Sequence, residues 1–257
     1  MSFARFRITY IGGPTALIEI GGLRLLTDPT FDPAGGEYQT PSYSLLKLQE
    51  PALDKDAIGR IDAVLLSHDH HFDNLDTSGR SLLNEVPRVL TTEVGAARLG
   101  GRTEGLAPWQ STELTNANGD RLTITASPAR HGPAHADRGP CIGFIVSSNS
   151  SDSVLYLSGD TVWYEGIAEV ARRYSVAVAV LFMGAARVGA AGPWHLTFTR
   201  EEGVEAARAF GKATIVPVHY EGWAHFTEHR DEIEQAFDKA RLGHRLCWLP
   251  AGVAKEF

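Results

Sequence analysis

The folds open to this chain are limited above all by a series of short apolar runs of strand length with turn-forming residues between them. In the first third of the chain, residues 6–11, 16–20 and 23–27 form such runs, separated by the pairs Gly12-Gly13 and Gly21-Gly22. Two-glycine breaks between strand-like runs predict consecutive hairpins, and therefore an antiparallel meander. Residues 30–51 contain proline and glycine without a clear period, which predicts a long surface loop.

The remaining runs predict strands that alternate with helices. We expect strands at residues 61–66, 86–91, 122–129, 141–147, 153–157, 176–183 and 213–218, and helices at 73–84, 167–174, 199–210 and 226–240. Thr199 and Glu202 have the spacing of a capping box. Because no low-complexity linker divides the pattern, residues 1–257 are expected to form one domain in which helices flank two sheets.

Composition narrows the class of protein. The formal net charge is -7 for 257 residues, which argues against nucleic-acid or anionic-membrane partners. No apolar run reaches the length of a membrane span, and the segment Met1 to Arg7 lacks the apolar core of a secretory signal. Cys141 and Cys247 each lie in apolar segments, which favours reduced core thiols and a cytoplasmic location. The oligomeric state is left open.

The chemically richest segment follows the predicted strand 61–66 directly. It contains His68, His70, His71 and Asp73 within six residues. Imidazole and carboxylate ligands suit zinc and its first-row neighbours, and the end of a strand can hold them rigidly without sealing them from solvent. The alternative is a solvated polar turn that is rich in histidine.

Four further residues stand where a predicted strand gives way to a loop, or just before a helix: His131, Asp160, His195 and His219. Taken singly, each also has a purely structural explanation, as a surface histidine, an aspartate in a turn or a core histidine hydrogen-bonded to a carbonyl. Together with the histidines of residues 68–71 and with Asp73, they resemble the metallo-β-lactamase superfamily. Within it, they resemble hydrolases similar to ascorbate-phosphate lactonases and phospholipase-D-type phosphodiesterases. The resemblance extends from Asp28 to His219 and implies an αββα sandwich, of mixed α/β class, with metals at one edge.

The first motif departs from the family pattern H-x-H-x-D-H. His68 and His70 fit its first two positions, but Phe72 stands where the aspartate is expected, and Asp73 comes one residue late. Taking His71 as the second histidine restores the spacing to Asp73. In either register, Asn74 replaces a histidine ligand.

The resemblance implies two metal pockets. The first would contain His68, either His70 or His71, and His131; the second would contain Asp73, Asp160 and His219. Because Asn74 is a weak substitute for histidine, the second metal is expected to be held less tightly or to be absent, unless His71 replaces the missing imidazole. One or two divalent ions are expected, zinc first and manganese second. The implied activity is attack by a metal-bound hydroxide on a small ester, lactone or phosphodiester substrate.

Further roles are implied for residues around the metals. Asp73 would help to orient the hydroxide, His195 would deliver a proton to the leaving group, and Asp28 would orient a ligand histidine. Arg130 and Arg187 are candidates for binding a substrate anion, with surface salt bridges as the alternative. Competing functions are a metal-binding sensor or regulatory protein, which Asn74 favours, a non-hydrolytic member of the fold, and a nuclease, which the net charge disfavours.

Overall fold

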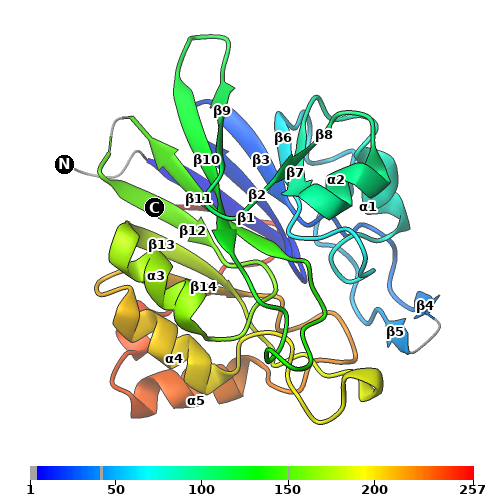
Figure 1. The fold of residues 1–257 in the computed structure, drawn as a ribbon, viewed down its shortest axis with the longest axis vertical. Helices are drawn as coiled ribbons and strands as arrows, with labels where there is room; N and C mark the ends of the chain where they lie inside the picture. The colour runs from blue at the N-terminus through cyan, green and yellow to red at the C-terminus, as the bar shows by residue number, and fades with distance from the viewer. Residues whose placement is uncertain (1–4, 41–42, 150) are drawn as a thin grey trace.

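The computed structural model describes residues 5–40, 43–149 and 151–257. Residues 1–4 and 41–42 lie outside the described residues. The first group belongs to the segment in which no secretory signal is expected, and the second belongs to the loop expected at residues 30–51. Two sheets dominate the fold (Figure 1). The first has the strand order β15 (Ala254–Glu256), β1 (Phe6–Gly12), β2 (Thr15–Ile20), β3 (Leu23–Thr27), β6 (Ala63–Leu65), β7 (Val89–Thr92) and β8 (Thr103–Leu106).

The second sheet and the helices complete a four-layer sandwich. The second sheet has the order β14 (Thr214–Val218), β13 (Ser175–Phe182), β12 (Ser153–Leu157), β11 (Ile142–Ser148), β10 (Arg121–Pro128) and β9 (Ser111–Thr115). The helices are α1 (Thr77–Leu82), α2 (Glu93–Leu99), α3 (Glu165–Arg173), α4 (Arg200–Ala209) and α5 (Arg230–Lys239), with short 3₁₀ turns at Gly189–Ala191 and Gly243–Arg245. In Figure 1, α3, α4 and α5 gather beside β13 and β14, while α1 and α2 lie on the opposite side of the molecule.

Alternation along the strands creates the layers. In β13, Val178 and Val180 face the core between the two sheets, whereas Ala179 and Leu181 face the core beneath α3, α4 and α5. This is the period of two that a strand buried on both faces requires. A third core, containing Leu26 and Leu82, lies between the first sheet and α1. The expected αββα sandwich is therefore confirmed.

Strand direction brings the candidate ligands to one edge. In the first sheet, β3 and β6 are parallel, so Asp28 and Ser67 follow neighbouring strand ends. In the second sheet, β12, β13 and β14 are parallel, and β10 shares their direction because β11 is antiparallel to both β10 and β12. The two sheets meet at this edge, where the Ile142 amide donates to the Ser67 carbonyl at 3.1 Å.

Several expected elements are confirmed. The β1–β2–β3 meander is antiparallel, with Gly13, Gly21 and Gly22 at positive φ in its turns. Both side chains of the Thr199 and Glu202 capping box make their predicted hydrogen bonds at α4. Both cysteines are buried. Among the described residues, none of the helices is long and apolar enough to cross a membrane.

Two expectations near the site need correction. Residues 30–51 are not simply a surface loop: they include the hairpin β4 (Glu37–Gln39) and β5 (Ser44–Leu46), and Tyr38, Leu45 and Lys47 are buried. The helix expected at 73–84 begins only at Thr77, because the Asp76 side chain caps it by accepting from the Gly79 amide at 2.8 Å. The helix α2 and the strands β8 and β9 were not predicted.

Candidate metal centre

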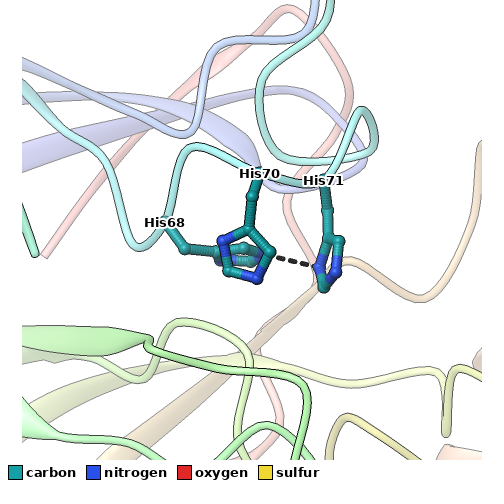
Figure 2. Close-up of side chains that lie close together, drawn as sticks. All are labelled: His68, His70 and His71. Atoms are coloured by element: carbon teal, nitrogen blue, oxygen red, sulfur yellow. Dashed lines mark hydrogen bonds between the residues drawn. The ribbon is translucent and has the colours of Figure 1, made fainter. Parts of the chain in front are cut away.

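Three imidazoles from two sheets converge on one point. Nδ1 of His71 lies 2.9 Å from Nε2 of His68 and 3.1 Å from Nε2 of His131. His68 and His71 follow β6, and His131 follows β10. Figure 2 shows His71 facing His68, with the contact drawn as a dashed line.

Hydrogen bonds around this cluster fix which nitrogen faces it. Nδ1 of His131 donates to the Leu196 carbonyl at 2.8 Å, which leaves the Nε2 lone pair facing inward. The Ser67 hydroxyl donates to Asp28 Oδ1 at 2.7 Å and therefore accepts from Nδ1 of His68 at 2.9 Å. The expected orienting role of Asp28 thus takes the form of a relay through Ser67, because Asp28 does not reach the imidazole directly.

His70 points differently from His71. Its Nε2 donates to the Arg138 carbonyl at 2.7 Å, while its Nδ1 is buried without a hydrogen-bond partner. His68, His70 and His71 still form one group whose ligand atoms lie within 4.8 Å of one another. The facing nitrogens of His68 and His131, however, favour His71 as the third member of the cluster.

Two carboxylates and an imidazole form a second cluster beside the first. Nε2 of His219 lies 3.4 Å from Asp73 Oδ2 and 3.4 Å from Asp160 Oδ1. The other oxygen of Asp160 lies 3.4 Å from Nε2 of His131, so this carboxylate stands between the two clusters. Asn74 donates to Asp160 Oδ1 at 3.4 Å, and its own carbonyl oxygen is buried without a partner.

Backbone geometry at this edge is unusual. His219 and Asp28, both at strand ends, have positive φ values of 56° and 28°, which are uncommon for residues other than glycine. Gly159, immediately before Asp160, has a φ of 60°, and a Cβ atom there would lie 2.5 Å from the Ile142 carbonyl oxygen. Such strained positions persist only where the surroundings fix them, and they gather at functional sites.

The charges of the two clusters differ. Burial, followed by the neighbouring imidazole of His131, lowers the pKa of His71 to about 3, so its ring is neutral. Burial also lowers the pKa of His219, but the carboxylates of Asp160 and Asp73 outweigh it and raise that pKa to about 10. The two buried carboxylates therefore stabilise positive charge between them, whether it is a proton on His219 or a bound cation.

The donor set fits divalent cations. His68 and His131 direct lone pairs at Nδ1 of His71, which carries at most one hydrogen and cannot satisfy both. In the second cluster, Nε2 of His219 is buried and has no hydrogen bond. Imidazole nitrogens and carboxylate oxygens at these separations are the ligands of zinc and related metals.

A narrow cleft of about 20 Å³ opens onto the clusters. Its lining includes Tyr43, His71, Asp73, His131, Arg138 and His225. His195 does not belong to this lining: its Nε2 lies 3.1 Å from Glu202 Oε2 at α4, although the next residue, Leu196, holds His131. Arg130, a predicted candidate for binding a substrate anion, stacks its guanidinium on the ring of Tyr164, 4.4 Å from the ring centroid.

His225 is the site residue that sequence reasoning missed. Its Nε2 lies 3.0 Å from Asp73 Oδ2, across 152 positions of the chain. It does not follow a predicted strand, so the strand-end pattern that located the other candidate ligands does not predict it. Tyr43 and Arg138 were also missed, because they come from loops with no recognisable spacing to a motif.

The fold and site together define a protein of the metallo-β-lactamase type: an αββα sandwich with histidines and aspartates gathered at one edge between its sheets. Residues 23–220 match the model of the β-lactamase superfamily domain, and the chain belongs to that family. The predicted resemblance is thereby confirmed.

Individual relatives agree with this placement. A UPF0173 metal-dependent hydrolase of Pyrobaculum aerophilum is 26% identical over 97% of this chain and 99% of its own length. An uncharacterized protein of Mycobacterium tuberculosis is 28% identical over 84% of this chain, which spans only 59% of that relative.

Solved structures show the same fold. An isothiocyanate hydrolase from Delia radicum gut bacteria superimposes with a TM-score of 0.79 at 20% identity, covering 98% of each chain. Igni18, a metallo hydrolase from Ignicoccus hospitalis, superimposes with a TM-score of 0.73 at 19% identity, also covering 98% of each chain.

Proposed function

We propose that this protein is a metal-dependent hydrolase that acts on a small ester, lactone or phosphodiester and uses two divalent ions, zinc first. The position of Asp160 carries the proposal. Its two oxygens lie 3.4 Å from Nε2 of His131 and 3.4 Å from Nε2 of His219, as a carboxylate shared by two metals would. The metal-dependent hydrolase among the full-length relatives supports the same reading.

The ligands divide into two sets in this proposal. His68, His71 and His131 would hold the first ion, Asp73 and His219 would hold the second, and Asp160 would contribute to both. Residues 1–257 act as one domain, since the ligands come from both sheets and the core between the sheets is continuous.

The bound metals supply a water whose pKa is lowered to about 7 and a Lewis acid for the substrate oxygen. The chain's own residues orient the reacting groups. Asp28 and Ser67 hold His68, and the Leu196 carbonyl holds His131. Leu45 and Leu196 contribute apolar surface to the wall of the cleft.

His225 replaces His195 as the proposed proton donor to the leaving group. It lines the cleft and lies 3.0 Å from Asp73, whereas His195 lies outside the cleft lining and faces Glu202. In protein assayed with saturating metal, because His225 also holds the Asp73 carboxylate, His225→Ala is expected to lower turnover at least tenfold, within the range usual for general acids. His195→Ala serves as the matched control, and equal losses in the two variants would contradict the assignment.

Activity is tested with bis(p-nitrophenyl) phosphate and a panel of lactones and esters, using protein loaded with zinc, loaded with manganese, or stripped by a chelator. The proposal expects hydrolysis of at least one substrate class that chelation abolishes and metal restores. Inactivity with every metal and substrate would instead favour a metal-binding sensor, the alternative suggested by Asn74 in place of a histidine.

A further inference from the structure

The cleft contains a cationic side chain whose charge is not matched by a partner. Arg138 lines the cleft, and among the described residues no carboxylate lies within ion-pair distance of its guanidinium. Some other arginines are engaged: Arg98 pairs with Asp69, and Arg173 stacks on the ring of Trp109 at 4.0 Å. The adjacent carboxylate of Asp137 instead accepts from backbone amides, including that of Gly139 at 2.9 Å.

The backbone of Arg138 is tied to the candidate metal centre on both sides. Its amide donates to the His131 carbonyl at 2.8 Å, and its carbonyl accepts from Nε2 of His70 at 2.7 Å. His131 and the neighbour of His70, His71, both belong to the first cluster. These two hydrogen bonds therefore fix the loop that carries Arg138 relative to the candidate metal centre. His70 accordingly has a positioning role rather than that of a metal ligand.

Tyr43 provides a neutral donor in the same cleft. Its ring lies edge-on to that of His71, with 6.3 Å between the centroids, and it lines the cleft together with Arg138. A tyrosine hydroxyl can donate a hydrogen bond to an anion. Apart from these two residues and the His and Asp side chains of the candidate metal centre, the cleft wall is apolar and consists of Leu45, Ala186, Val188 and Leu196.

A planar guanidinium beside a phenol, in a small and largely apolar cleft, is suited to a carboxylate or phosphate group. We propose that Arg138, assisted by Tyr43, binds an anionic group of the substrate, so that the enzyme selects phosphodiesters, or small esters and lactones that carry a further anionic group, over neutral esters and lactones. This inference rests on the proposed function for its catalytic meaning, but the anion site can be tested without catalysis.

Binding is measured by calorimetry on zinc-loaded protein with benzoate and with its neutral analogue benzamide. Arg138→Leu is expected to weaken benzoate binding roughly 10- to 100-fold, the range for a lost charge-assisted hydrogen bond, and to leave benzamide unchanged. Arg138→Lys keeps the charge and should recover part of the benzoate affinity. Arg208→Leu is the matched control, because Arg208 is exposed on α4, pairs with Glu205 and does not line the cleft.

Equal benzoate affinity in wild type and Arg138→Leu, or no benzoate binding by the wild type, would overturn the anion site. The residual benzoate affinity of Arg138→Leu measures what zinc alone contributes. Metal content and circular dichroism of each variant establish that the protein is loaded and folded.

Hydrolysis links the anion site to the reaction. With mono-4-nitrophenyl glutarate and 4-nitrophenyl valerate, which share a leaving group and differ in charge, Arg138→Leu should lower kcat/KM at least tenfold for the anionic ester only. If benzoate binding depends on Arg138 but no substrate in either panel is hydrolysed, the proposed function fails while the anion site stands. If both esters are cleaved equally well by wild type and variant, the selectivity fails while the hydrolase stands.

Discussion

Replacing Lys47 with methionine is expected to destabilise the protein by about 3 kcal/mol. Lys47 and Asp76 form a buried ion pair at 3.0 Å, with side chains 4% and 0% exposed. This pair joins the β4–β5 hairpin, which brings Tyr43 and Leu45 to the cleft, to the start of α1, three residues after Asp73. Removing the ammonium leaves the Asp76 charge buried without its cation.

The size of this loss of stability depends on the hydrogen bonds that Asp76 retains in the variant. Breaking a buried pair usually costs about 3–5 kcal/mol. Asp76 still accepts from the amides of Gly79 at 2.8 Å and Asp32 at 2.6 Å, so the lower end applies. For a chain of this size, that loss corresponds to a fall in Tm of roughly 6–12 °C.

Urea unfolding of wild type and Lys47→Met at 25 °C measures this loss directly. Lys55→Met is the matched control: Lys55 lies 3.3 Å from Glu85, but it is only partly buried and Glu85 is exposed, so the expected cost is below about 1 kcal/mol. Adding Asp76→Asn to Lys47→Met should recover part of the stability, because the unpaired charge disappears. A loss below about 1 kcal/mol for Lys47→Met would refute this reasoning.

Three further outcomes are expected. Ser67→Ala should weaken zinc binding roughly 10- to 100-fold in a competition with a chromogenic chelator, because His68 loses the hydroxyl that orients it. Thr199→Ala should cost about 1 kcal/mol in urea unfolding by removing the side chain that caps α4, and a neutral result would count against the cap. Burial raises the pKa of Asp32, but hydrogen bonds from Ser78, Tyr38 and Thr77 outweigh it and hold the pKa below 3.8. Its contribution is complete above about pH 4 and is lost as the pH falls through the folded-state pKa, so Asp32→Asn should flatten the acid limb of the stability curve, and an unchanged limb would exclude this role.

Much of the site could be predicted because ligand positions follow strand ends. His131, Asp160 and His219 each come directly after an apolar run, and the shared direction of β10, β12 and β14 brings those ends to one edge. Period and turn residues identify such strands without knowledge of the tertiary structure. His225 has no such signal, because it acts through a contact with Asp73 that only the folded loop creates.

Spacing alone could not choose between His70 and His71. The choice depends on ring orientation, and that orientation is set by the Arg138 carbonyl, which takes the Nε2 proton of His70. The hairpin within residues 30–51 was missed for a similar reason. Its burial depends on the ion pair between Lys47 and Asp76, 29 positions apart, which local propensity does not register.

Metal content, measured by mass spectrometry on purified wild type, His70→Ala and His71→Ala, tests the proposed centre most directly. Two ions per chain are predicted in the wild type, with one lost in His71→Ala and both retained in His70→Ala. His71→Ala that keeps two ions while His70→Ala loses one would contradict the assignment. One ion in the wild type would contradict the shared role of Asp160.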